Sequence, residues 1–178
     1  MNTGPTPDPL RIAILTLSDS RDESTDRSGA LLASELEKAG HKIVDKVVCG
    51  DDRWAVRSLV CNWVAHQVDV VVATGSTGVT GRDIAPEALE PLFDKHLAGF
   101  GELFRQLSYA DIGASTIQSR ASAGLCGRTL VCQGCLKLLV LFLTVFTRTL
   151  HLDLHLANGL SQKIVPVSYT HLTLPTIY

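Results

Sequence analysis

The run Val68-Asp69-Val70-Val71-Val72-Ala73 continues directly into Thr74-Gly75-Ser76-Thr77-Gly78, and this transition is the strongest indication of the fold. A short apolar run that breaks into alternating glycine and hydroxyl residues is typical of a buried strand leading into a phosphate-binding turn, because glycine lets backbone N–H groups approach an anion closely. Pro86 lies where the next helix is expected to begin, since proline is favoured in the first helical turn. Residues 68–87 therefore predict a strand, a ligand-binding loop and a helix start at the carboxyl edge of an α/β sheet. On these residues alone, a glycine-rich turn without a ligand is the alternative.

Two further strands are predicted upstream of this stretch. Arg11–Leu17 is a continuous apolar run, as expected for a strand buried on both faces, and Lys42–Val48 is a second, less regular one. The residues between them predict a helix that begins after a polar cap, Asp26 or Ser28. Apolar residues at helical spacing predict another helix from Arg53 to about Gln67. Strands that alternate with helices in this way favour a parallel, doubly wound sheet.

Downstream of the loop, the sequence predicts helices near Pro86–Lys95 and Phe100–Leu107. The loop itself has no Walker ending of Gly-Lys-Ser/Thr and no Gly-x-Ser-x-Gly nucleophile elbow. These two absences argue against a P-loop nucleotidase and against a serine hydrolase of the α/β type.

The composition narrows the class of protein. The 178 residues suit one domain that can bury a core. A formal net charge of −2 excludes the strongly basic surface typical of nucleic-acid binding, and the longest apolar run, Leu138–Phe146, is too short to span a bilayer. The first residues lack the apolar region of a signal peptide, and the five cysteines follow no disulfide-framework spacing. We therefore expect a cytoplasmic protein with no nucleic-acid or membrane partner.

Acidic or hydroxyl side chains follow each of the predicted strands. In a parallel sheet, the loops at Ser18–Asp19, Gly50–Asp52 and Thr74–Asp83 share one edge, which is the edge where ligands bind. Asp51 and Asp83 could hold a Mg²⁺ ion that phosphates also bind, as is usual in phosphoryl-transfer sites. Each aspartate also has a structural interpretation, Asp51 as a helix N-cap and Asp83 as a charge favoured by the next helix dipole. The convergence of three such loops favours the functional interpretation.

A longer series of motifs resembles one protein family. The series runs in a fixed order through residues 10–124, and the joint pattern is specific. Its members are Arg11–Leu17 with Ser18, Asp26-x-Ser28-Gly29, Ala39-Gly40-His41, Thr74–Gly78, Arg82–Ala88, Gly99–Glu102, Phe104-Arg105 and Ser119-Arg120-Ala121. The chain is similar to the MoaB/MogA family of molybdenum cofactor biosynthesis, and to its MoaB branch in particular.

The resemblance implies a fold, an assembly and a reaction. The family fold is a three-layer α/β/α sandwich around a mostly parallel sheet, and the family assembles as a homotrimer or as a pair of trimers, a homohexamer. Its adenylylating branch transfers AMP from Mg-ATP to the terminal phosphate of molybdopterin and releases pyrophosphate. By this resemblance, the chain is expected to be a molybdopterin adenylyltransferase that uses Mg²⁺ and ATP.

The resemblance also implies site residues. Asp51 and Asp83 align with the two essential aspartates of the family, and they are the expected catalytic and Mg²⁺-binding residues. The expected substrate-binding residues are Ser18, Thr74, Gly75, Ser76, Thr77, Gly78, Glu102, Ser119 and Arg120, of which the last three match the pterin side of the family pocket. Ser76 replaces a family glycine, a change that is tolerated only if the position does not need a positive φ.

The family pattern stops at about Gly124. Residues 1–9 are expected to be a disordered lead-in, 10–124 the molybdopterin-binding domain, and 125–178 an aberrant segment read out of frame. The family has a Leu-Pro-Gly-Ser-Pro-like loop where this chain reads Val131–Lys137. Back-translation from the third base of Val131 permits Leu-Pro-Gly-x-Pro-Glu, so one frameshift between Gly124 and Val131 would explain the missing loop. The last eleven residues resemble vector or adaptor read-through.

Three alternatives stay open beside the adenylyltransferase. The chain could bind molybdopterin without catalysis, since the MoaB branch does not always have an assigned reaction. It could be a competence-damage-type nucleotide amidohydrolase or pyrophosphatase on the same fold. It could also be an inactive truncated product, because the missing loop belongs to the ligand pocket of the family.

Overall fold

The computed structural model describes residues 9–134, so nearly all of the expected lead-in and the chain from residue 135 onward lie outside the described part. In chain order the elements are β1 (Arg11–Leu17), α1 (Arg27–Lys38), β2 (Lys42–Cys49), α2 (Arg53–Ala65), β3 (Val70–Thr74), α3 (Ala85–Leu89), the 3₁₀ helix η1 (Glu90–Leu92), β4 (Lys95–His96), α4 (Ala98–Ile112), the 3₁₀ helix η2 (Gly113–Gln118), β5 (Ser122–Cys126) and β6 (Thr129–Gly134). Strands and helices alternate through the first half of this order, as the sequence predicts.

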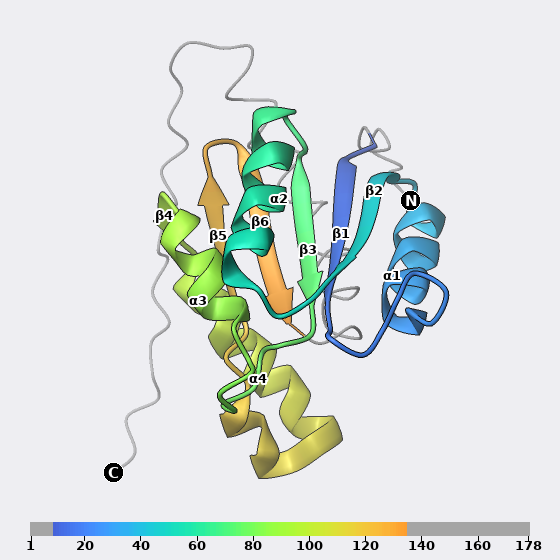
Figure 1. Ribbon diagram of the computed structural model, residues 1–178. Coiled ribbons are helices and arrows are strands. Elements are labelled where there is room, and N and C mark those ends of the chain that lie inside the picture. The colour runs from blue at the N-terminus through green and yellow to red at the C-terminus, as the bar shows by residue number, and fades with distance from the viewer. Residues whose placement is uncertain (1–8, 135–178) are drawn as a thin grey trace, which may run out of the picture.

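The strands form one six-stranded sheet in the order β2-β1-β3-β6-β5-β4 (Figure 1). β1 pairs in parallel with β2 and β3, and β3 pairs in parallel with β6. Only β5 runs antiparallel to its neighbours, β6 and β4. β3 and β6 are buried along their whole lengths, as expected for central strands with both faces covered.

Helices cover both faces of the sheet. One apolar cluster joins Leu32 and Leu36 of α1 and Phe100 and Phe104 of α4 to one face of the central strands. The other cluster joins apolar residues of α2 and α3, among them Val60, to the opposite face. The expected three-layer α/β/α sandwich with a mostly parallel sheet is therefore confirmed.

Polar caps set where two of the helices begin. The Asp26 carboxylate accepts the Gly29 N–H at 2.9 Å and caps α1. Gly40 follows the end of that helix with φ +92°, the left-handed conformation that glycine adopts without penalty. Asp52 caps α2, because its carboxylate accepts the N–H groups of Trp54 and Ala55 at 2.8 and 3.3 Å. These local rules explain why both helices fall where the sequence predicts them.

The helix predicted over Pro86–Lys95 is wrong beyond its first turn. α3 ends at Leu89, η1 follows, and the chain is already in strand β4 at Lys95. Pro91 explains the early end, because a proline inside a helix removes a hydrogen bond and its ring clashes with the carbonyl four residues earlier. The helix predicted over Phe100–Leu107 is present and longer, as α4.

The described sheet continues past residue 124. β5 ends at Cys126, and the whole of β6 lies in the segment that was expected to be aberrant. β6 pairs with β3 from Leu130 opposite Val70 to Gly134 opposite Thr74. Within residues 9–134, no helix is long and apolar enough to cross a membrane.

Candidate functional site

The parallel strands deliver three loops to one edge of the sheet. β1, β2 and β3 all end at this edge, so Ser18, Gly50 and Gly75 each begin a loop there (Figure 1). The Ser18 N–H donates to the Cys49 carbonyl at 2.9 Å, which ties the first two loops together. The predicted convergence of loops at the carboxyl edge therefore exists in the structure.

A cavity of about 450 Å³ opens at this edge, and we call it the hydroxyl cavity. Its lining residues are Thr16, Leu17, Ser18, Ser20, Arg21, Ser28, Thr74, Gly75, Thr77 and Gly134. Thr16, Thr74 and Gly134 are direct neighbours in the registers of β1, β3 and β6, so they lie side by side across three strands. Among the described residues that line the cavity, six side chains carry a hydroxyl, Arg21 is the only charged one, and none carries a carboxylate. The Thr16 hydroxyl donates to the buried Asp26 carboxylate, which leaves the other five hydroxyls as donors toward the cavity. Such a set of donors with one guanidinium suits an anion.

The backbone of the loop after β3 is constrained by close packing. Gly75 has φ +96°, and a Cβ there would lie 2.3 Å from the Leu17 carbonyl oxygen, so no other residue fits. Ser76 has φ +53°. The condition stated for tolerating serine here is therefore not met by the backbone, because the loop keeps the left-handed turn that suits glycine.

Ser76 compensates for its backbone conformation with hydrogen bonds across the loop. Its hydroxyl accepts the Ile84 N–H at 2.7 Å, and its carbonyl accepts the Ala85 N–H at 3.1 Å. The hydroxyl also donates to the Arg82 carbonyl at 3.3 Å. α3 has no side-chain cap of its own at Ile84, so Ser76 satisfies N–H groups at the start of that helix. Ser76 is thus turned toward the loop and is not among the residues that line the hydroxyl cavity.

Asp51 is not the helix cap that its structural interpretation suggested. Asp52 takes that role, while Asp51 leaves its carboxylate without a hydrogen-bond partner at a buried Oδ1. The Asp51 N–H donates to the Asp19 carboxylate at 2.8 Å, so acidic side chains from two loops gather here. Burial raises the pKa of the Cys49 thiol, and Asp52, Asp51 and Asp19 add to the increase. A buried, unpaired carboxylate oxygen in negative surroundings is suited to a cation.

Asp83 is held by the turn that precedes α3. Its carboxylate accepts the Thr80 N–H at 2.8 Å and the Thr80 hydroxyl at 2.6 Å, and its own N–H donates to the Thr80 carbonyl at 3.0 Å. The Thr80 hydroxyl lowers the pKa of Asp83, and hydrogen bonds from backbone N–H groups lower it further. The carboxylate is thus held ionised in one orientation rather than serving only the dipole of α3.

The Mg²⁺ expected from the resemblance can be tested against these residues. Within residues 9–134, no group of three or more His, Cys, Asp or Glu side chains could hold a metal by itself. Mg²⁺, however, is commonly bound by one or two carboxylates together with substrate phosphates. The unpaired Asp51 oxygen fits that mode of binding, with Asp83 as a second carboxylate on the same edge.

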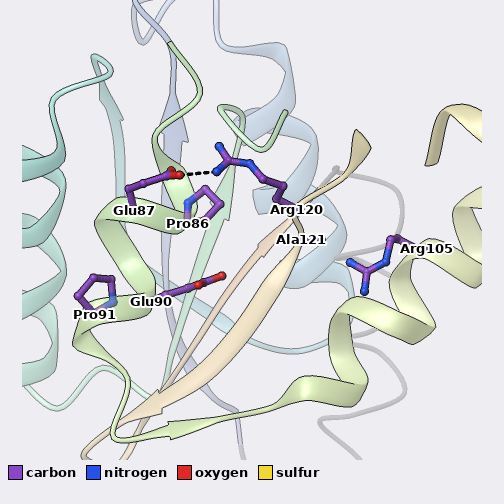
Figure 2. Close-up of a pocket in the computed structure, with 7 residues that line it drawn as sticks. All are labelled: Pro86, Glu87, Glu90, Pro91, Arg105, Arg120 and Ala121. Carbon is purple, nitrogen blue, oxygen red and sulfur yellow. Dashed lines mark hydrogen bonds and ion pairs between the residues drawn. The ribbon is translucent and has the colours of Figure 1, made fainter. Parts of the chain in front are cut away.

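Arg120 borders a second cavity, also about 450 Å³, which we call the Arg120 cavity. Its lining residues are Pro86, Glu87, Glu90, Pro91, Arg105, Arg120 and Ala121 (Figure 2). The Arg120 guanidinium forms an ion pair with the Glu87 carboxylate and lowers the pKa of that carboxyl group. The lining residues come from α3, from η1, from helix α4 and from the segment just before β5.

The remaining expected residues differ in whether they line a cavity. Ser18, Thr74, Gly75 and Thr77 line the hydroxyl cavity together. Glu102 is exposed on α4 and is not among the lining residues of either cavity described above.

Gly78 and Ser119 are not among the lining residues of either cavity. Gly78 packs against the Asp83 carboxylate, because a Cβ there would lie 2.7 Å from one of its oxygens. Ser119 contributes its carbonyl, which accepts from Arg105 at 3.4 Å. These two positions are therefore structural neighbours of the site.

Six residues that line the hydroxyl cavity were not among the expected site residues. Three of them, Ser20, Arg21 and Ser28, lie between β1 and the first turn of helix α1, and Arg21 donates to the Ser28 hydroxyl at 3.1 Å. The others are Thr16 and Leu17, near the end of β1, and Gly134, at the end of β6. A signal was present in the sequence, since a polar run comes directly after the apolar strand at residues 11–17. Its connection to the loop after β3 required the parallel pairing of β1 with β3.

Comparisons with known proteins agree with this fold. The family model described as "Probable molybdopterin binding domain" matches residues 13–145. Molybdenum cofactor biosynthesis protein B of Escherichia coli K12 is 52% identical over 124 residues, which are 69% of this chain and 73% of that protein.

Solved structures show the same likeness. A crystal structure of molybdenum cofactor biosynthesis protein B superposes with a TM-score of 0.73 at 39% identity, over 82% of this chain and 98% of that one. The tungsten cofactor synthesizing protein MoaB of Pyrococcus furiosus superposes with a TM-score of 0.68 at 32% identity, over 85% and 98%. The matched family region, the level of identity and the shared fold lead to one conclusion: the chain belongs to the family of probable molybdopterin-binding domains that includes the molybdenum cofactor biosynthesis proteins B.

Proposed function

We propose that the chain binds the phosphate end of molybdopterin in the hydroxyl cavity and transfers AMP to it from Mg-ATP. The observation that carries this proposal is the lining of that cavity, whose described residues offer five donor hydroxyls besides Thr16, one guanidinium and no carboxylate. A phosphate group is the anion that such a set of donors fits best. The family description names molybdopterin, which ends in a phosphate group, as the bound molecule.

The proposed reaction is an attack by a terminal phosphate oxygen of molybdopterin on the α-phosphorus of ATP. A new P–O bond forms at the α-phosphorus, and the bond between that phosphorus and the bridging oxygen of pyrophosphate breaks. Such a transfer depends on positioning and on charge neutralisation more than on a strong base. No protein side chain needs to form a covalent bond in this step.

Different residues of the chain would bind phosphate oxygens, supply positive charge and hold the metal ion. Ser18, Thr74 and Thr77 would donate hydroxyl hydrogen bonds to phosphate oxygens, and Arg21 would supply positive charge at the rim. Gly75 lets the loop backbone pack against the end of β1, which keeps the cavity wall close to the phosphate. When bound, Mg²⁺ would neutralise phosphate charge, and Asp51 with Asp83 would hold it.

The test is single-turnover formation of adenylylated molybdopterin from ATP labelled at the α-phosphate. We expect Asp51→Asn and Asp83→Asn each to lower the rate at least about 100-fold, because each removes a charge that orders the phosphates. Asp52→Asn is the matched control, since Asp52 caps α2 and should leave the rate within about threefold. Unchanged rates in both the Asp51 and the Asp83 variants would refute the proposal.

A binding protein without catalysis is the second candidate, and one observation favours it. Gly134 lines the hydroxyl cavity and is the last described residue, so the chain leaves β6 at the cavity. The family resemblance places a Leu-Pro-Gly-Ser-Pro-like loop there, which this sequence lacks. Saturable molybdopterin binding that Thr77→Val weakens, without AMP transfer in the unmodified chain, would select this candidate.

We also propose that the chain acts in the cytoplasm as a homotrimer or homohexamer. The family resemblance supports this assembly. Sedimentation equilibrium of the purified chain gives the mass directly, and a monomer at micromolar concentration would contradict the proposal.

A further inference from the structure

Arg120 reaches into the loop after β3 with its main chain and with its whole guanidinium. Its N–H donates to the Thr77 carbonyl at 3.0 Å. Nε donates to the Gly78 carbonyl at 2.6 Å, and one terminal nitrogen donates to the Asp83 carbonyl at 2.7 Å. The other terminal nitrogen pairs with the Glu87 carboxylate (Figure 2).

These contacts engage every nitrogen of the guanidinium within the chain. Two of the three acceptors are main-chain carbonyls at Gly78 and Asp83, on either side of the turn that contains Thr80. Arginine suits this task because its planar, forked donors have a fixed geometry that an ammonium group lacks. These contacts use three of the five guanidinium N–H donors, so at most two remain for a substrate phosphate.

These contacts, which we call the Arg120 clamp, also determine the orientation of Asp83. Thr80 fixes the Asp83 carboxylate through two hydrogen bonds, and Arg120 fixes the carbonyl of the same residue. Residues 75–84 have no regular secondary structure, so no helix or strand holds their carbonyls in place. Without the Arg120 guanidinium, the Gly78 and Asp83 carbonyls would lose the hydrogen bonds that they accept from it. The orientation of Asp83 therefore depends on Arg120 through the turn, not through direct side-chain contact.

Arg120 is itself anchored to the sheet. Gln133 of β6 is fully buried, and its side-chain amide donates to the Arg120 carbonyl at 3.1 Å and to the Ser122 hydroxyl at 3.0 Å. Burial strengthens these bonds, because a buried amide that lost them would keep an unsatisfied donor. A continuous chain of contacts thus runs from the central strand β6 through Arg120 to the turn at Asp83.

We propose that Arg120 is a positioning residue that holds the turn at residues 77–87, and through it Asp83, rather than a residue that binds the substrate. This assignment rests on the proposed function for its kinetic consequence, but its structural consequence stands alone. It replaces the role on the pterin side of the pocket that the family resemblance implies for Arg120.

Hydrogen exchange of the ligand-free chain tests the structural part. Four loop amides are hydrogen-bonded, those of Thr80, Asp83, Ile84 and Ala85. Arg120→Lys should raise the exchange rate of these amides by about tenfold or more, because lysine cannot replace three fixed contacts. An unchanged rate in a folded Arg120→Lys chain would overturn the proposal.

Arg105→Lys is the matched control. Arg105 lines the same cavity, but within residues 9–134 its guanidinium has a single, long hydrogen bond of 3.4 Å to the Ser119 carbonyl. Its substitution should leave the four amides within about twofold of the unmodified chain. An equal increase in both variants would mean that the cavity, not the clamp, protects the loop, and it would also overturn the proposal.

Glu87→Gln keeps the test decisive if Arg120→Lys does not fold. This change removes the ion pair and leaves the two carbonyl contacts, so we expect a two- to threefold rise in exchange confined to residues 77–87. A flat exchange profile in the Glu87→Gln chain would count against the clamp.

The kinetic readout separates positioning from binding. A positioning role predicts that Arg120→Lys lowers kcat for AMP transfer about tenfold while KM for molybdopterin changes less than about threefold. A large rise in KM with normal loop exchange would show that Arg120 binds substrate, and it would overturn the proposal. If the unmodified chain shows no AMP transfer, the proposed function fails. The hydrogen-exchange measurement still tests whether Arg120 holds the turn.

Discussion

Ser76 shows at the scale of one residue how this chain departs from the glycine of its family. A non-glycine residue in the left-handed region costs about 1–2 kcal/mol, and Ser76 has φ +53°. Its hydroxyl offsets part of that cost by accepting the Ile84 N–H at 2.7 Å. Strain and compensation therefore reside in the same side chain, and two substitutions separate them.

The first prediction compares Ser76→Ala with Ser76→Gly in urea unfolding. The alanine variant keeps the strain and loses the hydroxyl, so its free energy of unfolding should fall by about 1–2 kcal/mol. The glycine variant loses the same hydroxyl but relieves the strain, so it should be more stable than the alanine variant by about 1 kcal/mol. Equal stabilities would show that Ser76 stores no strain.

The second prediction concerns Gly75, where the packing leaves no space. Gly75→Ala places a Cβ 2.3 Å from the Leu17 carbonyl oxygen at φ +96°, and should lower the free energy of unfolding by at least about 2 kcal/mol. Gly81→Ala is the control in the same loop, because Gly81 has no heavy atom within 4 Å of the added Cβ. Thermal unfolding of both variants decides the matter, and a shift in the Gly81 variant as large as in the Gly75 variant would contradict this account.

At the scale of elements, helix α1 is joined to the site by its cap. The buried Asp26 accepts the Gly29 N–H with one oxygen and the Thr16 hydroxyl with the other, each at 2.9 Å. Thr16 in turn lines the hydroxyl cavity. The same carboxylate therefore begins a helix and fixes the Thr16 side chain in the wall of the proposed phosphate site.

The third prediction concerns this double role. Asp26→Ala should lower the free energy of unfolding by about 2–4 kcal/mol, since it removes a cap and leaves a buried hydroxyl without its acceptor. Asp52→Ala removes only the exposed cap of α2 and should cost about 1 kcal/mol. Urea unfolding measures both values, and equal losses would show that the Thr16 contact adds nothing.

Strand β6 is the element whose position the sequence left open. It lies between β3 and β5 in the sheet, within the region that the family model matches, although the motifs that carry the resemblance end before it. Six buried residues are enough to form this strand, because strands pair through backbone N–H and C=O groups. Every residue except proline carries both groups.

The fourth prediction tests the position of β6 by thiol chemistry. Burial raises the pKa of Cys132 to about 12, and burial is also the main cause that raises the pKa of Cys126 to about 11. Both thiols stay protonated and shielded at pH 8, whereas Cys61 is exposed on α2. Alkylation of the native chain, mapped by mass spectrometry, should modify Cys61 first and reach Cys126 and Cys132 only after unfolding. Labelling of Cys132 as fast as Cys61 would place β6 outside the sheet core.

At the scale of the whole molecule, the reading frame of the C-terminal segment bears on both stability and activity. The segment 125–178 is proposed to be read out of frame from a point between Gly124 and Val131, and only its residues 125–134 are described. Leu138–Phe146 is an uncharged apolar run of the kind that promotes aggregation when it is not packed. The frame of this segment stays a prediction that the coding DNA decides.

The fifth prediction compares the 178-residue chain with a frame-corrected chain. Restoring the Leu-Pro-Gly-Ser-Pro-like loop and the packing after it should raise the melting temperature by about 5 °C or more. It should also restore AMP transfer if the loop belongs to the ligand pocket. A corrected chain that melts no higher, or coding DNA without this loop in any frame, would refute the frameshift.

The amino-acid sequence alone predicts the layered α/β fold and the edge that carries the site. Apolar runs at residues 11–17 and 68–73 have no polar face, so they had to become strands covered on both sides, and their polar continuations had to meet at one edge. The approximate starts of α1 and α2 could be predicted as well, because capping depends on polar side chains within a few residues, although the capping residue itself was left open for α1 and misassigned for α2.

The roles of the individual side chains at that edge follow from the tertiary structure and could not be predicted from the sequence. Asp52 rather than Asp51 caps α2, Ser76 adopts the glycine conformation, and Arg120 turns to the loop carbonyls. The last of these depends on contacts between segments far apart in the chain, such as the 42 residues between Gly78 and Arg120. Local propensity and spacing carry no information on such contacts, because they form only when strand pairing brings the strand ends together.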